Sequence, residues 1–223
     1  MQFKSRHDIK KALSRSDILQ IDCSDLPLLL DDEGLNSLLY NEPFSKICFT
    51  CSVVSGFFRK GMVVYLDLDT LFTSYVRNGI FNADSRQLEI FLPSENEFER
   101  MLSDVCSLLN PDVKLVVVDS LNSFYHLYDG IKIGSLNRLL SSYVSLLLNH
   151  TERLGCKLLV TSMIRYKKTS AWILAPSSKR LIEAKSSVIL SAELVKGSLF
   201  INLLKEQPLK KLVIAKQYLP LKA

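Results

Sequence analysis

The chain has 223 residues, of which 48% are hydrophobic and 23% are charged, with 28 Lys and Arg against 23 Asp and Glu. This composition is typical of one α/β domain with a substantial core, and it excludes a disordered tail or a collagen-like chain. No apolar run approaches the ~18 residues of a membrane span, and no apolar signal follows the charged first eight residues. We therefore expect a soluble, cytoplasmic protein with no membrane partner.

Charge is unevenly divided along the sequence. Residues 1–150 carry 14 basic and 19 acidic side chains, a net −5, whereas residues 151–223 carry 14 basic and 4 acidic side chains, a net +10. Such a basic region attracts polyanions by releasing their counterions, although a solvated basic face is the plainer alternative.

Cysteine and histidine give no sign of a metal or redox site. The five cysteines are an odd set in mostly apolar segments, which predicts buried free thiols. Cys48 and Cys51 form a CxxC pair in a segment that reads as a helix, without further ligands at zinc spacing. No histidine lies in a recognisable nucleophile motif. We expect no metal, no cofactor and no catalytic residue of these types.

The first half of the chain alternates strand and helix patterns after a short basic helix at 8–19 and an acidic, leucine-rich linker or lid at 22–34. Ser94 and Glu97 have the spacing of a capping box, so we expect Ser94 to be the N-cap of a helix. The expected elements are a strand at 38–40, a helix at 44–58, a strand at 62–66, a helix at 70–77, a strand at 88–92 and the helix that follows Ser94.

The second half continues this βαβ alternation and then changes. The β-branched run at 115–119 predicts a central strand buried on both faces, followed by a helix at 135–154 and a strand at 156–161. Two further runs at 187–194 and 199–204, separated by Lys196 and Gly197, predict an antiparallel hairpin. The sequence therefore indicates an α/β fold with a mostly parallel central sheet flanked by helices and a C-terminal antiparallel hairpin. We divide it into an N-terminal helix and linker, 1–34, and one core domain, 35–223.

Acidic residues close two of the predicted strands. Asp119 ends one strand, and Asp67 and Asp69 follow another. Carboxylates at the carboxyl ends of parallel strands are suited to hold a hydrated magnesium ion or to activate water, although they also cap turns. The loop at 41–47, after the strand at 38–40, contains neither glycine of the phosphate-binding pattern GxxxxGK[ST].

The order of these segments resembles the ATPase core of the RecA/RadA recombinases, and most of all the short archaeal RadA paralogues that lack the amino-terminal domain. The resemblance covers about residues 35–219. It rests on the strand end at 64–70, the Walker B-like strand at 115–120 with its flanking serine at 123, the sensor-like strand at 158–163 and the closing hairpin at 188–204 with its tail. It implies a RecA-like fold and association with itself or with a recombinase or another RecA-fold paralogue.

The departures from the family concern the nucleotide site. Lys46 alone remains of the phosphate loop, Asp69 aligns with the catalytic glutamate and is one methylene shorter, and Asp119 aligns with Walker B. Met163 replaces the glutamine that senses the γ-phosphate, and the thioether side chain of Met163 cannot donate a hydrogen bond. We read Lys46, Asp69 and Asp119 as vestigial positions and expect neither tight ATP binding nor ATP hydrolysis. The alternative is that Lys46 is only a helix-face lysine.

The segment after the sensor-like strand corresponds to a DNA-contacting loop of the family. It combines cations, which attract phosphates, with aromatic rings, which stack on unpaired bases. The alternative for Trp172 is simple packing against the hairpin. The expected nucleic-acid-binding residues are Arg165, Tyr166, Lys167, Lys168, Trp172, Lys179 and Arg180.

The sequence supports three hypotheses. The first is an ATPase-inactive RadA-paralogue-like accessory protein of homologous recombination or DNA repair that binds single-stranded DNA and a recombinase partner. The second is an active or ATP-binding RecA-like ATPase, which the degenerate loop disfavours. The third is a structural subunit of a RecA-fold hetero-oligomer that binds RNA, similar to the inactive subunits of the Elongator complex.

Overall fold

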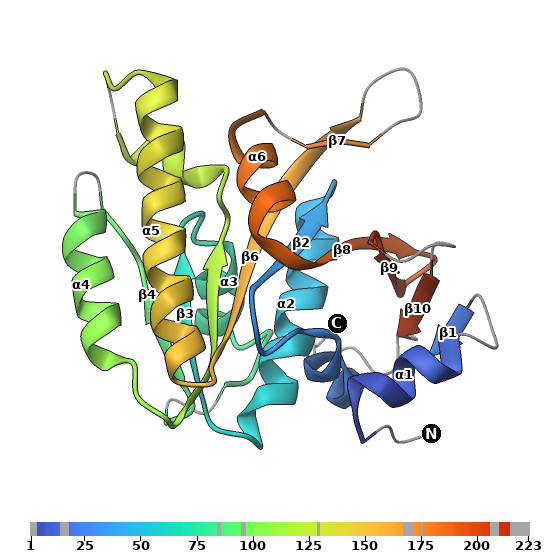
Figure 1. Ribbon diagram of the computed structural model, residues 1–223. Helices are drawn as coiled ribbons and strands as arrows, with labels where there is room; N and C mark the ends of the chain where they lie inside the picture. The colour runs from blue at the N-terminus through green and yellow to red at the C-terminus, as the bar shows by residue number, and fades with distance from the viewer. Residues whose placement is uncertain are drawn as a thin grey trace.

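The computed structural model describes residues 4–13, 18–83, 86–94, 97–128, 130–166, 172–174, 176–205 and 210–214. Helices and strands alternate along most of this length (Figure 1). They are α1 (Arg6–Leu13), β1 (Ile18–Gln20), the 3-10 helix η1 (Cys23–Leu29), β2 (Leu35–Tyr40), α2 (Pro43–Phe58), β3 (Met62–Asp67), α3 (Leu71–Arg77), β4 (Leu88–Phe91), α4 (Phe98–Leu108), β5 (Val113–Asp119), the 3-10 helix η2 (Ser123–Leu127), α5 (Ile133–Arg153), β6 (Lys157–Tyr166), β7 (Trp172–Leu174), α6 (Pro176–Lys185), β8 (Ser186–Val195), β9 (Ser198–Leu203) and β10 (Lys210–Ile214).

A single ten-stranded sheet organises the fold, with the strand order β1-β10-β9-β8-β2-β6-β5-β3-β4 and β7 paired to β6. The strands from β8 to β4 in this order are parallel, whereas β8, β9 and β10 pair antiparallel with one another in turn. Both the parallel core and the antiparallel C-terminal hairpin predicted from the sequence are confirmed. β5 lies inside the sheet, as its β-branched composition predicted.

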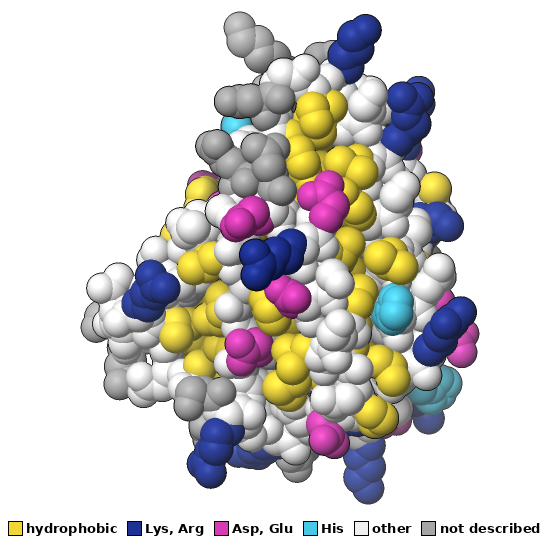
Figure 2. All heavy atoms as spheres, turned by 90° about the vertical axis from the view of Figure 1, so that its left-hand side faces the viewer, with side chains coloured by type: hydrophobic (Ala, Val, Ile, Leu, Met, Phe, Trp, Pro, Cys, Tyr) yellow, Lys and Arg dark blue, Asp and Glu magenta, His cyan; other side chains and the backbone are white. Residues whose placement is uncertain are grey.

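Two hydrophobic clusters cover the two faces of the sheet. One joins α1, η1, α2 and α3 to one face, and the other joins α4, α5 and α6 to the opposite face. Figure 2 looks onto the side of the molecule that carries α4 and α5, where hydrophobic side chains form a broad band between scattered charges. Leu92 and Leu146 are 41% and 42% exposed. No helix in the described ranges is long and apolar enough to cross a membrane.

The N-terminal segment differs from its description as a linker. β1 pairs in parallel with β10, so it forms one edge of the sheet. Residues 22–34, expected as an acidic linker or lid, contain η1, and the side chains of Leu26 and Leu29 are buried in the cluster that contains α2. Gly56 of α2 allows this close packing, because a Cβ at this position would lie 2.7 Å from Pro27. The division of the chain at residue 34 stays a prediction.

The capping box predicted at Ser94 is wrong. The helix α4 begins at Phe98, and Glu97 occupies the N-cap position without a side-chain cap. Ser94 instead contacts Glu97 before the helix, because the Glu97 N–H donates to its carbonyl at 3.2 Å and its hydroxyl contacts the Glu97 carboxylate. The spacing of the two residues was correct for mutual contact, but it did not fix where the helix starts.

Candidate functional site

The carboxyl ends of β2, β3 and β5 bring the vestigial nucleotide-site residues together. Lys46 lies on α2, which follows β2, and its side chain is 1% exposed. Its Nζ contacts Asp69 Oδ2 at 2.6 Å and Asp119 Oδ1 at 2.9 Å. The same Nζ lies 5.5 Å from the centre of the Tyr40 ring, a distance at which a cation interacts with an aromatic face. Lys46 is therefore an internal ion-pair residue and not an exposed helix-face lysine.

Asp119 is the centre of this network. Thr161 donates its hydroxyl to Oδ1 at 2.5 Å, and Tyr65 donates its hydroxyl to Oδ2 at 2.5 Å. Burial raises the pKa of Asp119, and the ammonium of Lys46 and the two hydroxyl donors oppose that rise. The pKa of Asp119 is raised overall because burial outweighs these contacts, although the ammonium and the two donors on its oxygens stabilise the carboxylate form.

Lys46 keeps its positive charge in this network. Burial by itself would lower the pKa of the Lys46 ammonium, but Asp119 and Asp69 outweigh burial and raise that pKa. Burial, followed by the charge of Asp119, also raises the pKa of Tyr65 well above its ordinary value, so Tyr65 remains a hydrogen-bond donor. Each buried group that contacts Asp119 thus carries the proton that its hydrogen bond requires.

Asp67 plays a different part from Asp69 and Asp119. It is fully buried, and its Oδ2 accepts the backbone N–H of Thr73 in α3 at 2.7 Å. Burial raises the pKa of Asp67 to about 6, and Thr73 opposes that rise. Asp69 Oδ1 similarly accepts the N–H of Leu71 at 3.2 Å. The turn-stabilising role considered for a strand-end carboxylate is confirmed for Asp67.

Carboxylate oxygens of Asp67, Asp69 and Asp119 lie within 4.8 Å of one another, a spacing that suits a divalent cation. The Lys46 ammonium, however, is bonded directly to Asp69 and Asp119. A metal ion would have to displace this ammonium, which has no other anionic partner in the described chain. The donor set in its present arrangement fits an ammonium and not a metal ion.

The start of α2 lacks the features of a phosphate site. Glu42 is the N-cap residue, and Pro43 is the first residue of the helix. Proline has no N–H, and the Lys46 N–H already donates to the Glu42 carbonyl. The N–H groups of Phe44 and Ser45 remain, beside a glutamate whose charge opposes an anion. A phosphate at this helix end would meet few donors and like charge.

Those expected nucleic-acid residues that the structure describes occupy neighbouring elements at the same edge of the sheet. Arg165 and Tyr166 end β6, where Tyr166 pairs with Trp172 of β7 in an antiparallel hairpin. Lys167 and Lys168 lie outside the described residues. Lys179 and Arg180 are exposed on α6, which follows the hairpin. Lys179 contacts Glu183 at 3.7 Å, but both side chains are more than half exposed and this pair contributes little.

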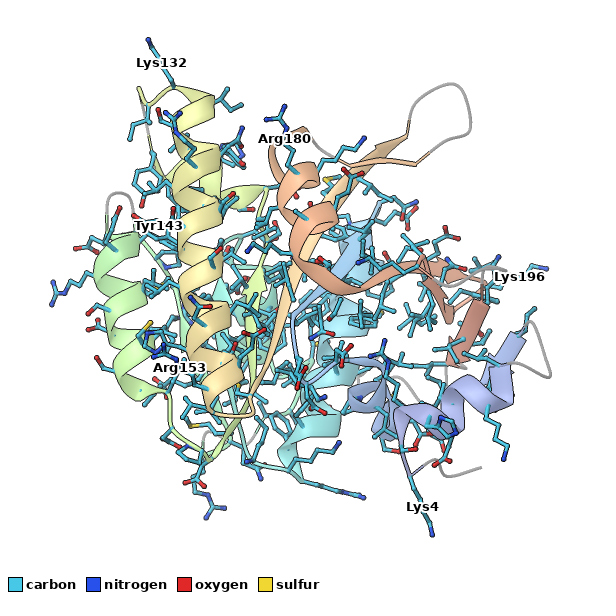
Figure 3. The ribbon with its side chains drawn as sticks, in the orientation of Figure 1. Lys4, Lys132, Tyr143, Arg153, Arg180 and Lys196 are labelled. Carbon is cyan, nitrogen blue, oxygen red and sulfur yellow. The ribbon has the colours of Figure 1, made fainter. Side chains whose placement is uncertain are left out.

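A groove between α5 and α6 adds an arginine that the sequence did not single out. It has a volume of about 810 Å³, and its lining contains two arginines and no carboxylate. Figure 3 shows Lys132, just before α5, and Arg180 of α6 pointing outward at the same end of the molecule. The lining residues are Gly134, Asn137, Arg138, Ser141, Ser142, Arg180 and Leu181.

Neither arginine of the groove has a carboxylate partner among the described residues. The Arg138 guanidinium donates to the Ser135 hydroxyl at 3.3 Å. α5 and α6 both begin at the edge of the sheet where the strands end, so the positive ends of both helix dipoles face this edge (Figure 1). The only hint of Arg138 in the sequence was its positive charge in a helix otherwise read for its leucines.

The fold and this edge define a class, the α/β proteins with a RecA-like fold. Among solved structures, the chain is similar to the crystal structure of the RadB recombinase, with a TM-score of 0.58 and 13% sequence identity over 85% of this chain and 89% of that chain. This similarity establishes the fold. No protein-family model and no curated protein sequence matches the chain.

Proposed function

We propose that this chain is a RecA-fold protein that does not turn over ATP and that assists homologous recombination or DNA repair by binding single-stranded DNA. Its partner would be a RadA-type recombinase or another RecA-fold paralogue. The proposal combines two features of one sheet edge, a closed vestigial nucleotide site and an open basic groove.

The inward ion pair of Lys46 is the observation that carries the first part. A phosphate-binding lysine must reach the phosphates of the bound nucleotide, whereas Lys46 is 1% exposed and bonded to two carboxylates. Binding ATP through Lys46 would separate a buried ion pair and leave Asp119 uncompensated. Few backbone N–H groups are available at the start of α2 to bind the phosphates. Nucleotide binding therefore gains little free energy to offset the loss of the buried ion pair.

The basic groove supports the second part. Arg138 of α5 and Arg180 of α6 line the groove. The hairpin that bears Arg165 and Tyr166 directly precedes α6 in the chain and lies at the same edge of the sheet. Guanidinium groups without carboxylate partners remain available for phosphate oxygens. The structural similarity to the RadB recombinase agrees with a role in recombination, which remains part of the proposal.

Fluorescence-anisotropy titration of labelled oligonucleotides tests the nucleic-acid function. We expect single-stranded DNA to bind with a strong salt dependence and little sequence preference, because phosphate contacts carry no sequence information. Matched DNA and RNA oligonucleotides distinguish the proposed function from the RNA-binding structural subunit. Tighter binding of RNA than of DNA of the same sequence would favour the RNA-binding structural subunit.

Association with a partner needs its own measurement. Light scattering at several concentrations, with and without a RadA-type recombinase, should show a species heavier than the 25.3 kDa chain. A strict monomer in both conditions would contradict this part of the proposal.

A further inference from the structure

The strand β6 extends beyond its neighbour β5. Pairing between the two strands ends at Val118 and Val160, but β6 continues to Tyr166. The segment after β5 supplies the missing partners, since the Leu121 N–H donates to the Thr161 carbonyl at 3.0 Å and the Met163 N–H donates to Asn122 Oδ1 at 2.6 Å. The Asn122 side chain thus accepts a backbone hydrogen bond from β6 beyond the point where the pairing of β6 with β5 ends.

Two buried serines extend this contact to α6. The hydroxyls of Ser162 and Ser178 lie 2.7 Å apart, and both residues are 0% exposed. Ser162 also donates to Asn122 Oδ1 at 3.3 Å. Because a hydroxyl has one proton, the arrangement that satisfies both contacts has Ser178 donating to Ser162 and Ser162 donating to Asn122. We refer to Asn122, Ser162 and Ser178 as the serine–asparagine clamp.

The clamp lies at the base of the elements that carry the expected nucleic-acid residues. Immediately after Met163, β6 pairs with β7, and α6 begins two residues after β7. Figure 1 shows the β6–β7 hairpin projecting from the sheet, with α6 beside it. The other end of the clamp is attached three residues after Asp119, the centre of the closed ion-pair network.

We propose that the serine–asparagine clamp holds the β6–β7 hairpin and α6 in the geometry that binds nucleic acid, without any nucleotide. This inference rests on the proposed function. A surface that is ordered before binding avoids the loss of conformational entropy on binding, so its affinity is higher than that of a loose surface. The clamp residues are positioning residues, since they act through the backbone of β6 and α6, and Ser162 and Ser178 are fully buried.

The variant Asn122→Ala tests the clamp, with Asn110→Ala as the matched control. Asn110 Oδ1 also accepts a backbone N–H, from Asp112 at 2.8 Å, but it precedes β5 at the opposite edge of the sheet. We expect Asn122→Ala to weaken binding of a labelled oligo-dT roughly 5- to 10-fold, because the hydrogen bonds from the Met163 N–H and the Ser162 hydroxyl are lost. The salt dependence should not change, because the phosphate contacts themselves remain.

Hydrogen exchange separates positioning from general loss of structure. In Asn122→Ala, the Met163 amide and the β6–β7 amides should exchange faster, whereas the amides of β3 and β5 should not. At Ser178, the Thr variant retains the hydroxyl and should bind as tightly as wild type, whereas Ser178→Ala should bind more weakly. This second pair remains informative if Asn122→Ala does not fold.

The outcomes distinguish the inference from the function on which it rests. Wild-type affinity in both Asn122→Ala and Ser178→Ala overturns the clamp while leaving nucleic-acid binding intact. Tighter wild-type binding upon addition of Mg-ATP overturns its independence from nucleotide. A wild-type chain that binds no oligonucleotide overturns the proposed function, and the clamp with it.

Discussion

Replacing Lys46 with methionine should destabilise the folded protein, because Lys46 is part of a buried ion pair. If Lys46 instead faced a ligand, the same substitution would affect only ligand binding. Methionine fills much of the same volume but removes the ammonium that contacts Asp69 and Asp119. Asp69 is 25% exposed and can be solvated, whereas Asp119 is fully buried and would lose its only cationic partner among the described residues. The loss is therefore concentrated at Asp119.

Removing one partner of a buried ion pair costs about 3–5 kcal/mol, because the other charge stays buried without compensation. For a chain of this length, such a loss lowers the melting temperature by roughly 6–20 °C. The hydroxyls of Tyr65 and Thr161 still donate to Asp119, so we expect a value near the lower end of this range. Urea unfolding at pH 7.5, followed by circular dichroism, measures the change.

Two further variants make this test specific. Lys60→Met removes an exposed lysine after α2 and should change the free energy of unfolding by less than about 0.5 kcal/mol. Lys46→Met combined with Asp119→Asn removes both charges and should recover much of the loss, giving a coupling energy in a double-mutant cycle. If Lys46→Met is as stable as Lys60→Met, Lys46 does not face inward in solution and the closed site is refuted.

The remaining predictions concern protons, nucleotide and salt. The pKa of Asp67 is about 6 in the folded chain against an ordinary value of 3.8, so the folded state binds this proton more tightly and stability falls as the pH rises from about 4 to about 6. In urea unfolding, Asp67→Asn should remove this change of stability with pH and stabilise the protein above pH 6 by at most about 3 kcal/mol. The control Asp104→Asn, at an exposed residue, should retain the pH dependence. An unchanged pH dependence in Asp67→Asn would show that Asp67 is not the titrating group. Millimolar Mg-ATP should neither be hydrolysed nor raise the melting temperature, because a ligand stabilises a protein only when it binds the folded state preferentially. Hydrolysis of ATP by the wild type that is abolished in Lys46→Ala would contradict this expectation. Each phosphate contact contributes about 0.7 to the slope of log K against log salt for a single strand. The double variant Arg138→Gln with Arg180→Gln should therefore flatten the slope by about 1.4, and the triple variant Arg165→Ala with Lys167→Ala and Lys168→Ala by about 2. An unchanged slope would assign the substituted residues to a solvated face.

The sequence by itself determined most core strands and helices and their order, but the helix predicted at 8–19 is wrong, since α1 ends at Leu13 and residues 18–20 form β1. β-branched runs such as 115–119 predict buried strands, and the leucine spacing of 135–154 predicts an amphipathic helix, because strand and helix periods differ. It also placed Asp67 and Asp119 at strand ends, and parallel strands bring such residues to one edge. The missing glycines of the 41–47 loop were likewise visible without a structure.

The tertiary structure decided which side chains meet. The direction of Lys46 depends on how α2 packs against the sheet, so the sequence left open whether Lys46 is a vestigial phosphate-loop lysine or only a helix-face lysine. Tyr65 and Thr161 are 54 and 42 residues from Asp119, and only strand order and register bring their hydroxyls to its carboxylate. Arg138 and Arg180 line one groove because α5 and α6 pack side by side on the same face of the sheet. Periodicity encodes local conformation and burial, whereas partners distant in sequence are chosen by packing, which no local pattern contains.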